Sequence, residues 1–196
     1  DQVAEQQGYT RAQQDAYATD SVLRARAAVE SGLFQSEITP VTLKVRGETV
    51  EIGQDETPAK CQPDKITRLK PAFRPDGTVT PASSASISDG AAALVLTRAS
   101  VAQQRGQQVL ARIVAHSTYA ADPGQFATAP VPAIERVLAK AGWQAADVDL
   151  FEVNEAFAVV ALHAMRELGL PHDKVNVSGG ACALGHPIGA TGARII

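Results

Sequence analysis

The spacing of hydrophobic and polar positions changes several times along the chain, and each change predicts a different element. The first predicted element is a helix from about Thr10 to Ser31. Thr10 and Gln13 have the spacing of a capping box, and Gly32 stands where a helix commonly ends in the left-handed conformation. The following run, 34–50, contains short β-like stretches interrupted by a glycine. The first quarter of the chain therefore predicts one long helix and short strands.

The next segment, 54–88, is rich in proline, aspartate, threonine and serine. Its prolines are Pro58, Pro63, Pro71, Pro75 and Pro81. Because proline lacks a backbone donor and clashes with the preceding turn, prolines this dense exclude a continuous helix. We expect a long irregular segment, of the kind that is usually functional or disordered in compact domains.

After Asp89 the pattern alternates between strands and helices. Apolar runs or period-two alternation predict strands at 93–96, 109–119, 148–153 and 174–178. Helical spacing predicts helices that begin near Pro132 and Glu155, and a glycine-rich loop after the last strand is expected to open a final helix. This alternation predicts an α/β fold with layered helices and sheets.

Composition narrows the class of protein. The 196 residues carry a formal charge of -3, so no basic surplus favours nucleic acid or an anionic membrane as partner. No apolar stretch is long enough to span a bilayer, and no secretory signal opens the chain. The two cysteines, Cys61 and Cys182, are too few for a disulfide framework. We expect a cytoplasmic protein, and because the chain starts without methionine and stops inside an apolar run, we expect a fragment.

The glycine-rich segment 178–192 holds the strongest candidate for chemistry. His186 stands between Gly185 and Pro187, and a proline restricts the backbone that precedes it. A histidine on a rigid turn after a strand is a candidate general base, although an ordinary loop with a surface histidine is an equal interpretation. The segment lacks the G-x-G-x-x-G pattern of dinucleotide sites. A zinc site needs about four ligands, and the chain offers no paired spacing beyond Cys182 and His186, so no metal is expected.

A second candidate lies where the predicted strand 148–153 ends. Asn154 there is either a helix N-cap or an amide that holds a ligand or water at the carboxyl end of the strand. Glu155 fits a first-turn residue that interacts with the helix dipole, and Phe157 fits core packing. The residues alone leave these alternatives open.

Together these segments resemble the thiolase family, in particular its bacterial-type acetyl-CoA acetyltransferases. The resemblance rests on Asn154-Glu155-Ala156-Phe157-Ala158 and on the run from Gly179 to Gly189 that contains Gly185-His186-Pro187. Further matches are 70–80, 88–93 and 141–143, and the order and spacing agree over nearly the whole chain.

The resemblance implies an αβαβα layered fold of two similar halves, with a loop domain inserted in the first. On this basis we expect a loop domain at 1–87, the end of the N-terminal half at 88–108, and an incomplete C-terminal half at 109–196. It also implies that the nucleophilic cysteine precedes Asp1 and that a second catalytic cysteine, in a Cys-x-Gly motif, follows Ile196. Neither Cys61 nor Cys182 stands in either position.

The implied reaction is a two-step acyl transfer between CoA thioesters. A thiol is a poor nucleophile until it loses its proton, and the family's histidine, matched by His186, takes that proton. Negative charge then develops on the thioester oxygen and needs placed donors. The same histidine supplies one donor, and a water held by the asparagine, matched by Asn154, supplies another.

The resemblance also assigns residues to the substrate pocket. Those matched to the pantetheine tunnel or the acyl group are Phe73, Pro81, Ala82, Ala85, Phe126, Ala156 and Phe157. Some positions depart from the family. Ala59 replaces an arginine common near the CoA phosphates, where Lys60 offers a substitute. Phe126 replaces a methionine of acetoacetyl-specific relatives and leaves the acyl-chain length open.

Three functions remain at this point. The first is reversible condensation of two acetyl-CoA molecules, the second is degradative cleavage of longer 3-ketoacyl-CoA in fatty acid metabolism, and the third is CoA binding without catalysis. Coenzyme A serves as substrate and product in the first two, with no separate cofactor. The family implies a homodimer or homotetramer.

Overall fold

The computed structural model describes residues 1–196 and consists mainly of helices. The α-helices are α1 (Gln2–Gln6), α2 (Arg11–Glu30), α3 (Thr57–Lys60), α4 (Ala99–Gln104), α5 (Pro130–Ala141), α6 (Ala158–Leu168), α7 (Ala181–Leu184) and α8 (Ile188–Arg194). The 3-10 helices are η1 (Pro63–Arg68), η2 (Pro123–Thr128), η3 (Ala145–Asp147) and η4 (His172–Lys174), and the strands are β1 (Val41–Val45) and β2 (Glu48–Ile52).

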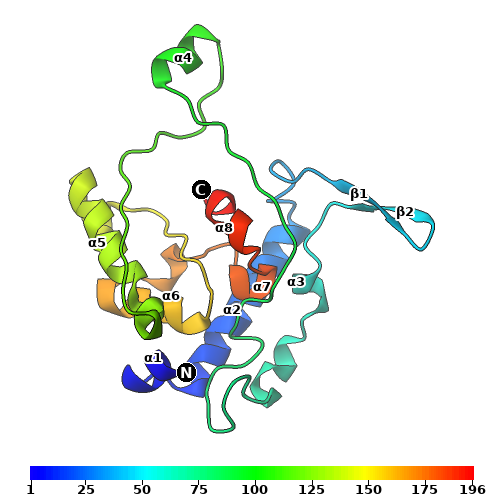
Figure 1. Ribbon diagram of the computed structural model, residues 1–196, viewed down its shortest axis with the longest axis vertical. Helices are drawn as coiled ribbons and strands as arrows, with labels where there is room; N and C mark the ends of the chain where they lie inside the picture. The colour runs from blue at the N-terminus through cyan, green and yellow to red at the C-terminus, as the bar shows by residue number, and fades with distance from the viewer.

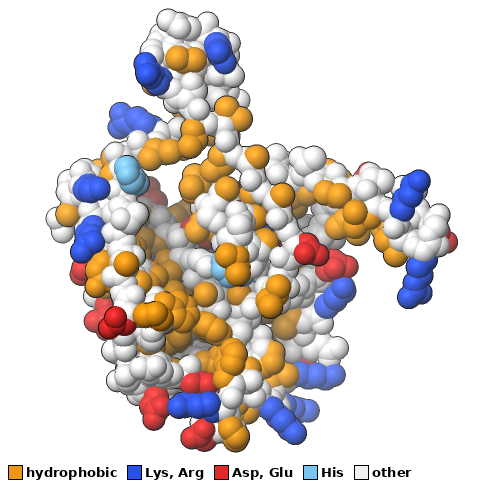
Figure 2. Space-filling view, in the orientation of Figure 1, with side chains coloured by type: hydrophobic (Ala, Val, Ile, Leu, Met, Phe, Trp, Pro, Cys, Tyr) orange, Lys and Arg blue, Asp and Glu red, His pale blue; other side chains and the backbone are white.

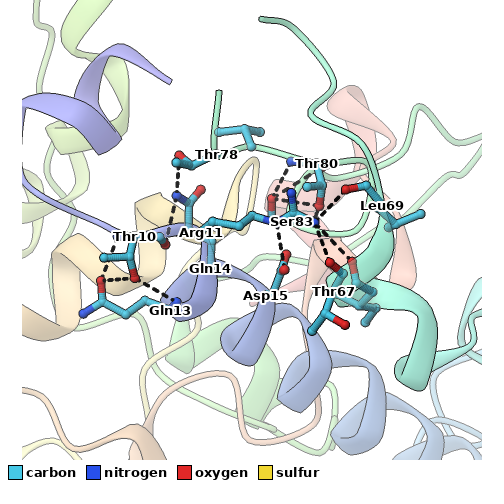
Figure 3. Close-up of polar contacts among 12 residues, drawn as sticks. Thr10, Arg11, Gln13, Gln14, Asp15, Thr67, Leu69, Thr78, Thr80 and Ser83 are labelled. Atoms are coloured by element: carbon cyan, nitrogen blue, oxygen red, sulfur yellow. Dashed lines mark hydrogen bonds and ion pairs between the residues drawn. The ribbon is translucent and has the colours of Figure 1, made fainter. Parts of the chain in front are cut away.

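Helix α2 runs through the middle of the molecule and contacts α6, α7, α3 and η1 (Figure 1). The predicted capping box is confirmed, because the Thr10 hydroxyl accepts from the Gln13 amide and the Gln13 side chain accepts from the Thr10 amide. Gly32, just beyond the helix, has the expected left-handed φ of 73°. The first turn of α2 is also bound to η1, because Arg11 pairs with Asp15 and donates to the carbonyl of Leu69 (Figure 3).

The main hydrophobic core lies between α6 and the helices around it. Fifteen buried residues form it, and α6 supplies Ala158, Val159, Val160, Ala161 and Ala164. Helix α6 begins three residues later than predicted and ends as expected, with Gly169 in the left-handed conformation at φ 62°. Helix α5 packs on α6, and it too ends at a left-handed glycine, Gly142.

Two of the predicted strands are present only as a short parallel contact. Phe151 bridges Val175, with backbone hydrogen bonds of 2.8 and 2.9 Å on either side. The backbone then turns at Asn176, whose φ is 48°. Its side chain continues the pairing, because the Asn176 amide accepts from the Val153 N–H at 2.7 Å and donates to the Val153 carbonyl at 2.8 Å. The Asn176 side chain thus makes the two hydrogen bonds that the backbone of the neighbouring strand would otherwise make.

The only ladder in the structure is the antiparallel hairpin β1–β2, in the segment where short strands were expected. Arg46 and Gly47 both have positive φ and form its two-residue turn. The hairpin projects from the body of the molecule (Figure 1), and every residue of both strands is exposed.

The predictions of strands at 93–96 and 109–119 are wrong at the level of hydrogen bonding. No backbone–backbone hydrogen bond involves residues 88–97 or 108–121, and α4 lies alone between them (Figure 1). Their apolar side chains are mostly exposed, with Val95 and Leu110 above 89%. Both segments have the hydrophobic pattern of strands, but no other segment of the 196 residues forms a sheet with them. No helix of the structure combines the length and the apolar character needed to cross a bilayer.

Candidate functional site

The glycine-rich segment folds as two short helices joined by a sharp turn, and His186 lies in that turn. Helix α7 ends at Gly185, whose φ of 90° only glycine adopts readily, and α8 begins after Pro187. The His186 backbone N–H donates to the carbonyl of Ser86 at 3.0 Å. The turn is therefore held by the helices before and after it and by the hydrogen bond to Ser86.

Both ring nitrogens of His186 have partners. Nδ1 lies 2.8 Å from the Thr191 hydroxyl oxygen, and Nε2 lies 3.4 Å from the Asn154 side-chain nitrogen. The Thr191 hydroxyl also lies 3.1 Å from the Pro187 carbonyl, which only accepts, so its proton points there and its oxygen accepts from Nδ1–H. This network assigns the tautomer in which Nε2 carries the lone pair. An imidazole in that state is able to take a proton at Nε2.

Asn154 is not a helix cap. Helix α6 starts at Ala158, and its N-cap residue is Phe157, which makes no side-chain capping bond. Asn154 instead lies in the loop after the short parallel contact, half-buried, with its amide toward His186. Its side-chain oxygen is buried and has no hydrogen-bond partner in the structure. The placement leaves a buried acceptor beside His186 that no protein group satisfies.

Glu155 lies elsewhere than the sequence predicted. The first-turn interpretation is wrong, because its side chain is fully buried, outside any helix, and accepts four hydrogen bonds. The donors, at 2.8 to 3.0 Å, are the Tyr17 and Ser21 hydroxyls, the Asn176 amide and the backbone N–H of Cys182. Burial, followed by the nearby Glu155 charge, raises the pKa of Tyr17, so its phenol stays a proton donor.

The glycines before His186 pack against protein. A Cβ built on Gly180 would lie 2.5 Å from Glu155 Oε1, and one on Gly179 would lie 2.5 Å from the Ser21 carbonyl oxygen. At Gly185 a Cβ would collide with the Ser88 hydroxyl. A glycine lets the backbone come close to a neighbouring group, either a ligand or the protein itself. In the structure, α2 and Glu155 occupy that space at two of these positions, and only the absence of side chains permits such close packing.

Three of the residues assigned to the substrate pocket form an aromatic cluster. Phe157 lies between Phe73 and Phe126, with ring-centroid distances of 5.9 and 6.0 Å. The Phe73 and Phe126 side chains are half exposed or more. Two other assigned residues, Ala85 and Ala156, are joined by a backbone hydrogen bond of 3.1 Å. Segments far apart in sequence thus bring an accessible apolar surface together.

Pro81 and Ala82, also assigned to the pocket, line a cavity of about 390 Å³ beside α2, α3 and η1. The cavity wall also contains Lys60 and Lys65, the only charged residues on it. The structure therefore separates the assigned residues into an aromatic cluster and this basic cavity, which are bridged by the 81–86 segment.

Neither cysteine contacts the candidate base. The Cys182 thiol is buried and donates to the Glu155 carbonyl at 3.7 Å, and burial raises its pKa well above the ordinary value. Cys61 is half-buried in the wall of the basic cavity, and burial raises its pKa as well. Both thiols are thus poor nucleophiles, and the structure brings neither to His186.

Comparisons with known proteins give the same family along the whole chain. The chain is 47% identical to a probable acetyl-CoA acetyltransferase of Dictyostelium discoideum over 197 aligned residues, which is 100% of this chain and 48% of that protein. Among solved structures, the acetyl-CoA acetyltransferase of Bacillus anthracis superposes with a TM-score of 0.95 at 45% identity, over 98% of this chain and 49% of the other. Human mitochondrial 3-ketoacyl-CoA thiolase gives 0.87 at 35% identity, over 98% and 49%.

The chain spans about half the length of the curated relatives it matches. The superposition confirms the expected fold class, an incomplete α/β thiolase fold, although most of its sheet hydrogen bonds are not formed within these residues. The boundaries at 87 and 108 stay predictions. The family model "Thiolase, N-terminal domain" matches residues 1–100 and "Thiolase, C-terminal domain" matches residues 107–196, and the chain therefore belongs to the thiolase family.

Proposed function

We propose that this chain is part of an acetyl-CoA acetyltransferase, which reversibly joins two acetyl-CoA molecules into acetoacetyl-CoA and CoA. The observation that carries the proposal is the pair formed by His186 and Asn154, whose side chains meet at 3.4 Å in a family whose relatives carry that activity in their names. The nucleophilic cysteine belongs to the part of the protein outside these 196 residues. Support for this comes from the two cysteines of the chain, which lie away from His186.

In the proposed first step His186 Nε2 takes the proton of the cysteine thiol. The thiolate attacks the acetyl-CoA carbonyl, the bond from that carbon to the CoA sulfur breaks, and CoA leaves with the proton from His186. In the second step a second cysteine, outside this chain, takes a proton from another acetyl-CoA. The resulting carbanion attacks the enzyme-bound acetyl group, and the nucleophilic cysteine leaves as a thiolate.

Oxyanions form on the thioester oxygen in both steps, and they are stabilised by donors placed beforehand. We assign this task to a water held by Asn154 and to His186 while its Nε2 carries a proton. The unpartnered Asn154 oxygen supports the assignment, because a buried acceptor requires a donor, and a water that donates to it keeps its other proton for the oxyanion.

For the substrate, we propose that the aromatic cluster of Phe73, Phe126 and Phe157 lines the pantetheine and acyl path. The rings are close-packed and accessible, as such a path requires. Pro81, Ala82, Ala85 and Ala156 border the same path. Lys60 in the basic cavity suits the CoA phosphates and stands in for the arginine that the family often has at Ala59.

The wider setting is proposed on the same basis. We place the protein in the cytoplasm, with CoA as substrate and product, no separate cofactor, and self-association as a homodimer or homotetramer. A role in fatty acid metabolism follows if longer chains are cleaved.

The test is a comparison of substrates with the complete protein. We expect CoA-dependent cleavage of acetoacetyl-CoA with a kcat/KM at least about tenfold above that for 3-ketodecanoyl-CoA. The reverse order would favour a degradative 3-ketoacyl-CoA thiolase, the function named for the human structural relative. CoA binding without cleavage of either substrate would overturn the proposal and leave a CoA-binding protein.

A further inference from the structure

The buried carboxylate of Glu155 connects three parts of the site. Its four donors come from α2, from the turn after the short parallel contact, and from the first turn of α7. Ser21 extends the network, because its hydroxyl oxygen also accepts from the Gly180 N–H at 3.0 Å. Glu155 is joined covalently to Asn154 and through Cys182 and Gly180 to α7, which ends two residues before His186.

The arrangement requires a carboxylate. All four partners direct a proton at Glu155, two at each oxygen, and Cys182 N–H and the Asn176 amide cannot reverse their roles. An uncharged Gln at 155 would place its NH₂ group against one of these two donors in either orientation. The NH₂ group would then face another donor, which is costly at a fully buried position.

The close packing leaves little room for the loop to adjust. Gly180 lies so near the carboxylate that even a methyl group would not fit between them. A change in the hydrogen bonds of Glu155 therefore moves the start of α7, and α7 is only four residues long. Displacement at its start is carried to Gly185 and His186.

We propose that Glu155 is a positioning residue of the thiolase reaction, which sets the distance between His186 and Asn154 by binding the first turn of α7. The inference rests on the proposed function. Glu155 itself touches no substrate. Tyr17 and Ser21 of α2 share the role, so the loop domain takes part in shaping the catalytic pair.

The test uses Glu155→Gln in the complete protein, assayed for acetoacetyl-CoA cleavage well below its unfolding temperature. We expect kcat to fall about 10- to 100-fold, as misplacement of catalytic groups by about 1 Å does, with KM changed less than about threefold. The matched control is Glu167→Gln, an exposed glutamate on α6 whose kcat should stay within about twofold. Unchanged kcat in a folded Glu155→Gln protein, or a change confined to KM, would overturn the inference.

Glu155→Gln carries some risk to folding, so two milder variants keep the test decisive. Tyr17→Phe and Ser21→Ala each remove one donor to the carboxylate. We expect each to lower kcat about three- to tenfold without a matching change in KM, and wild-type kcat in both would overturn the inference. Inactivity of the wild-type protein would instead contradict the proposed function, so the two failures are distinguishable.

Discussion

The region around Glu155 and the exposed stretches 88–97 and 108–121 differ in how many of their polar groups find hydrogen-bond partners within the chain. Around Glu155 every donor has an acceptor, and the side chains come from helices and turns far apart in sequence. In the exposed stretches no backbone group bonds to another backbone group, and apolar residues face outward (Figure 2). The chain thus satisfies the polar groups around Glu155 by itself and leaves the backbone of the exposed stretches without backbone partners.

The comparison explains which predictions hold. The capping box of α2 and the glycine that follows it are local signals, and they appear in the structure where the sequence places them. The strand at 93–96 needs a partner to become a strand, and no partner lies within these residues. Local signals survive in part of a fold, whereas sheet signals do not.

The largest expected effect is that of His186→Ala on the activity of the complete protein. Because His186 acts as base, acid and oxyanion donor in the proposal, we expect kcat for acetoacetyl-CoA cleavage to fall by about 10³-fold or more. Far-UV circular dichroism and the unfolding temperature should match the wild type. Turnover within tenfold of wild type would remove His186 from the mechanism.

Asn154→Ala follows, with an expected loss of about 10²-fold in kcat, because it removes the holder of one oxyanion donor. The measurement is steady-state kinetics of Asn154→Ala. Asn176→Ala is measured beside it, and that variant should lower the free energy of unfolding because it removes the hydrogen bonds to Val153. An unchanged rate in Asn154→Ala would leave this amide without a catalytic role.

Two glycine substitutions test how closely the region around Glu155 is packed. Gly180→Ala should destabilise this chain by about 2 to 4 kcal/mol, because its methyl group collides with the Glu155 carboxylate. Gly189→Ala, in α8 with nothing within 4 Å, should be neutral or stabilising by up to about 1 kcal/mol. Urea unfolding gives both values. Equal effects would show that Gly180 is not close-packed in solution.

The smallest effect on stability is expected from a substitution in the exposed stretch 88–97. Leu96→Ser should change the free energy of unfolding of this chain by less than about 0.5 kcal/mol, since Leu96 is 70% exposed. Val160→Ala, in the core of α6, should cost about 2 kcal/mol. A large loss from Leu96→Ser would mean that 88–97 is packed in solution, and the contrast between the two regions would be wrong.

The candidate site shows a similar division. His186 and Asn154 were singled out from the sequence because a restricted turn and a strand end are local patterns, and the resemblance to thiolases then favoured a catalytic role for both. The role of Glu155 was missed, since a glutamate after a strand gives no signal that Tyr17 and Ser21, more than 130 residues earlier, will donate to it. Likewise, no local pattern indicates that His163 in α6 is 6% exposed and that its ring lies 3.3 Å from the Tyr9 hydroxyl. Tertiary contacts of this kind leave no local trace.

The central claim is that His186 and Asn154 serve a nucleophile from outside these 196 residues. Its most direct test is to incubate the complete protein with acetyl-CoA, quench in acid, and locate the acetylated cysteine by peptide mass spectrometry. The account predicts an acetyl thioester on a cysteine other than Cys61 and Cys182, lost when His186 is replaced by alanine. Acetylation of Cys61 or Cys182 at the rate of turnover would contradict it.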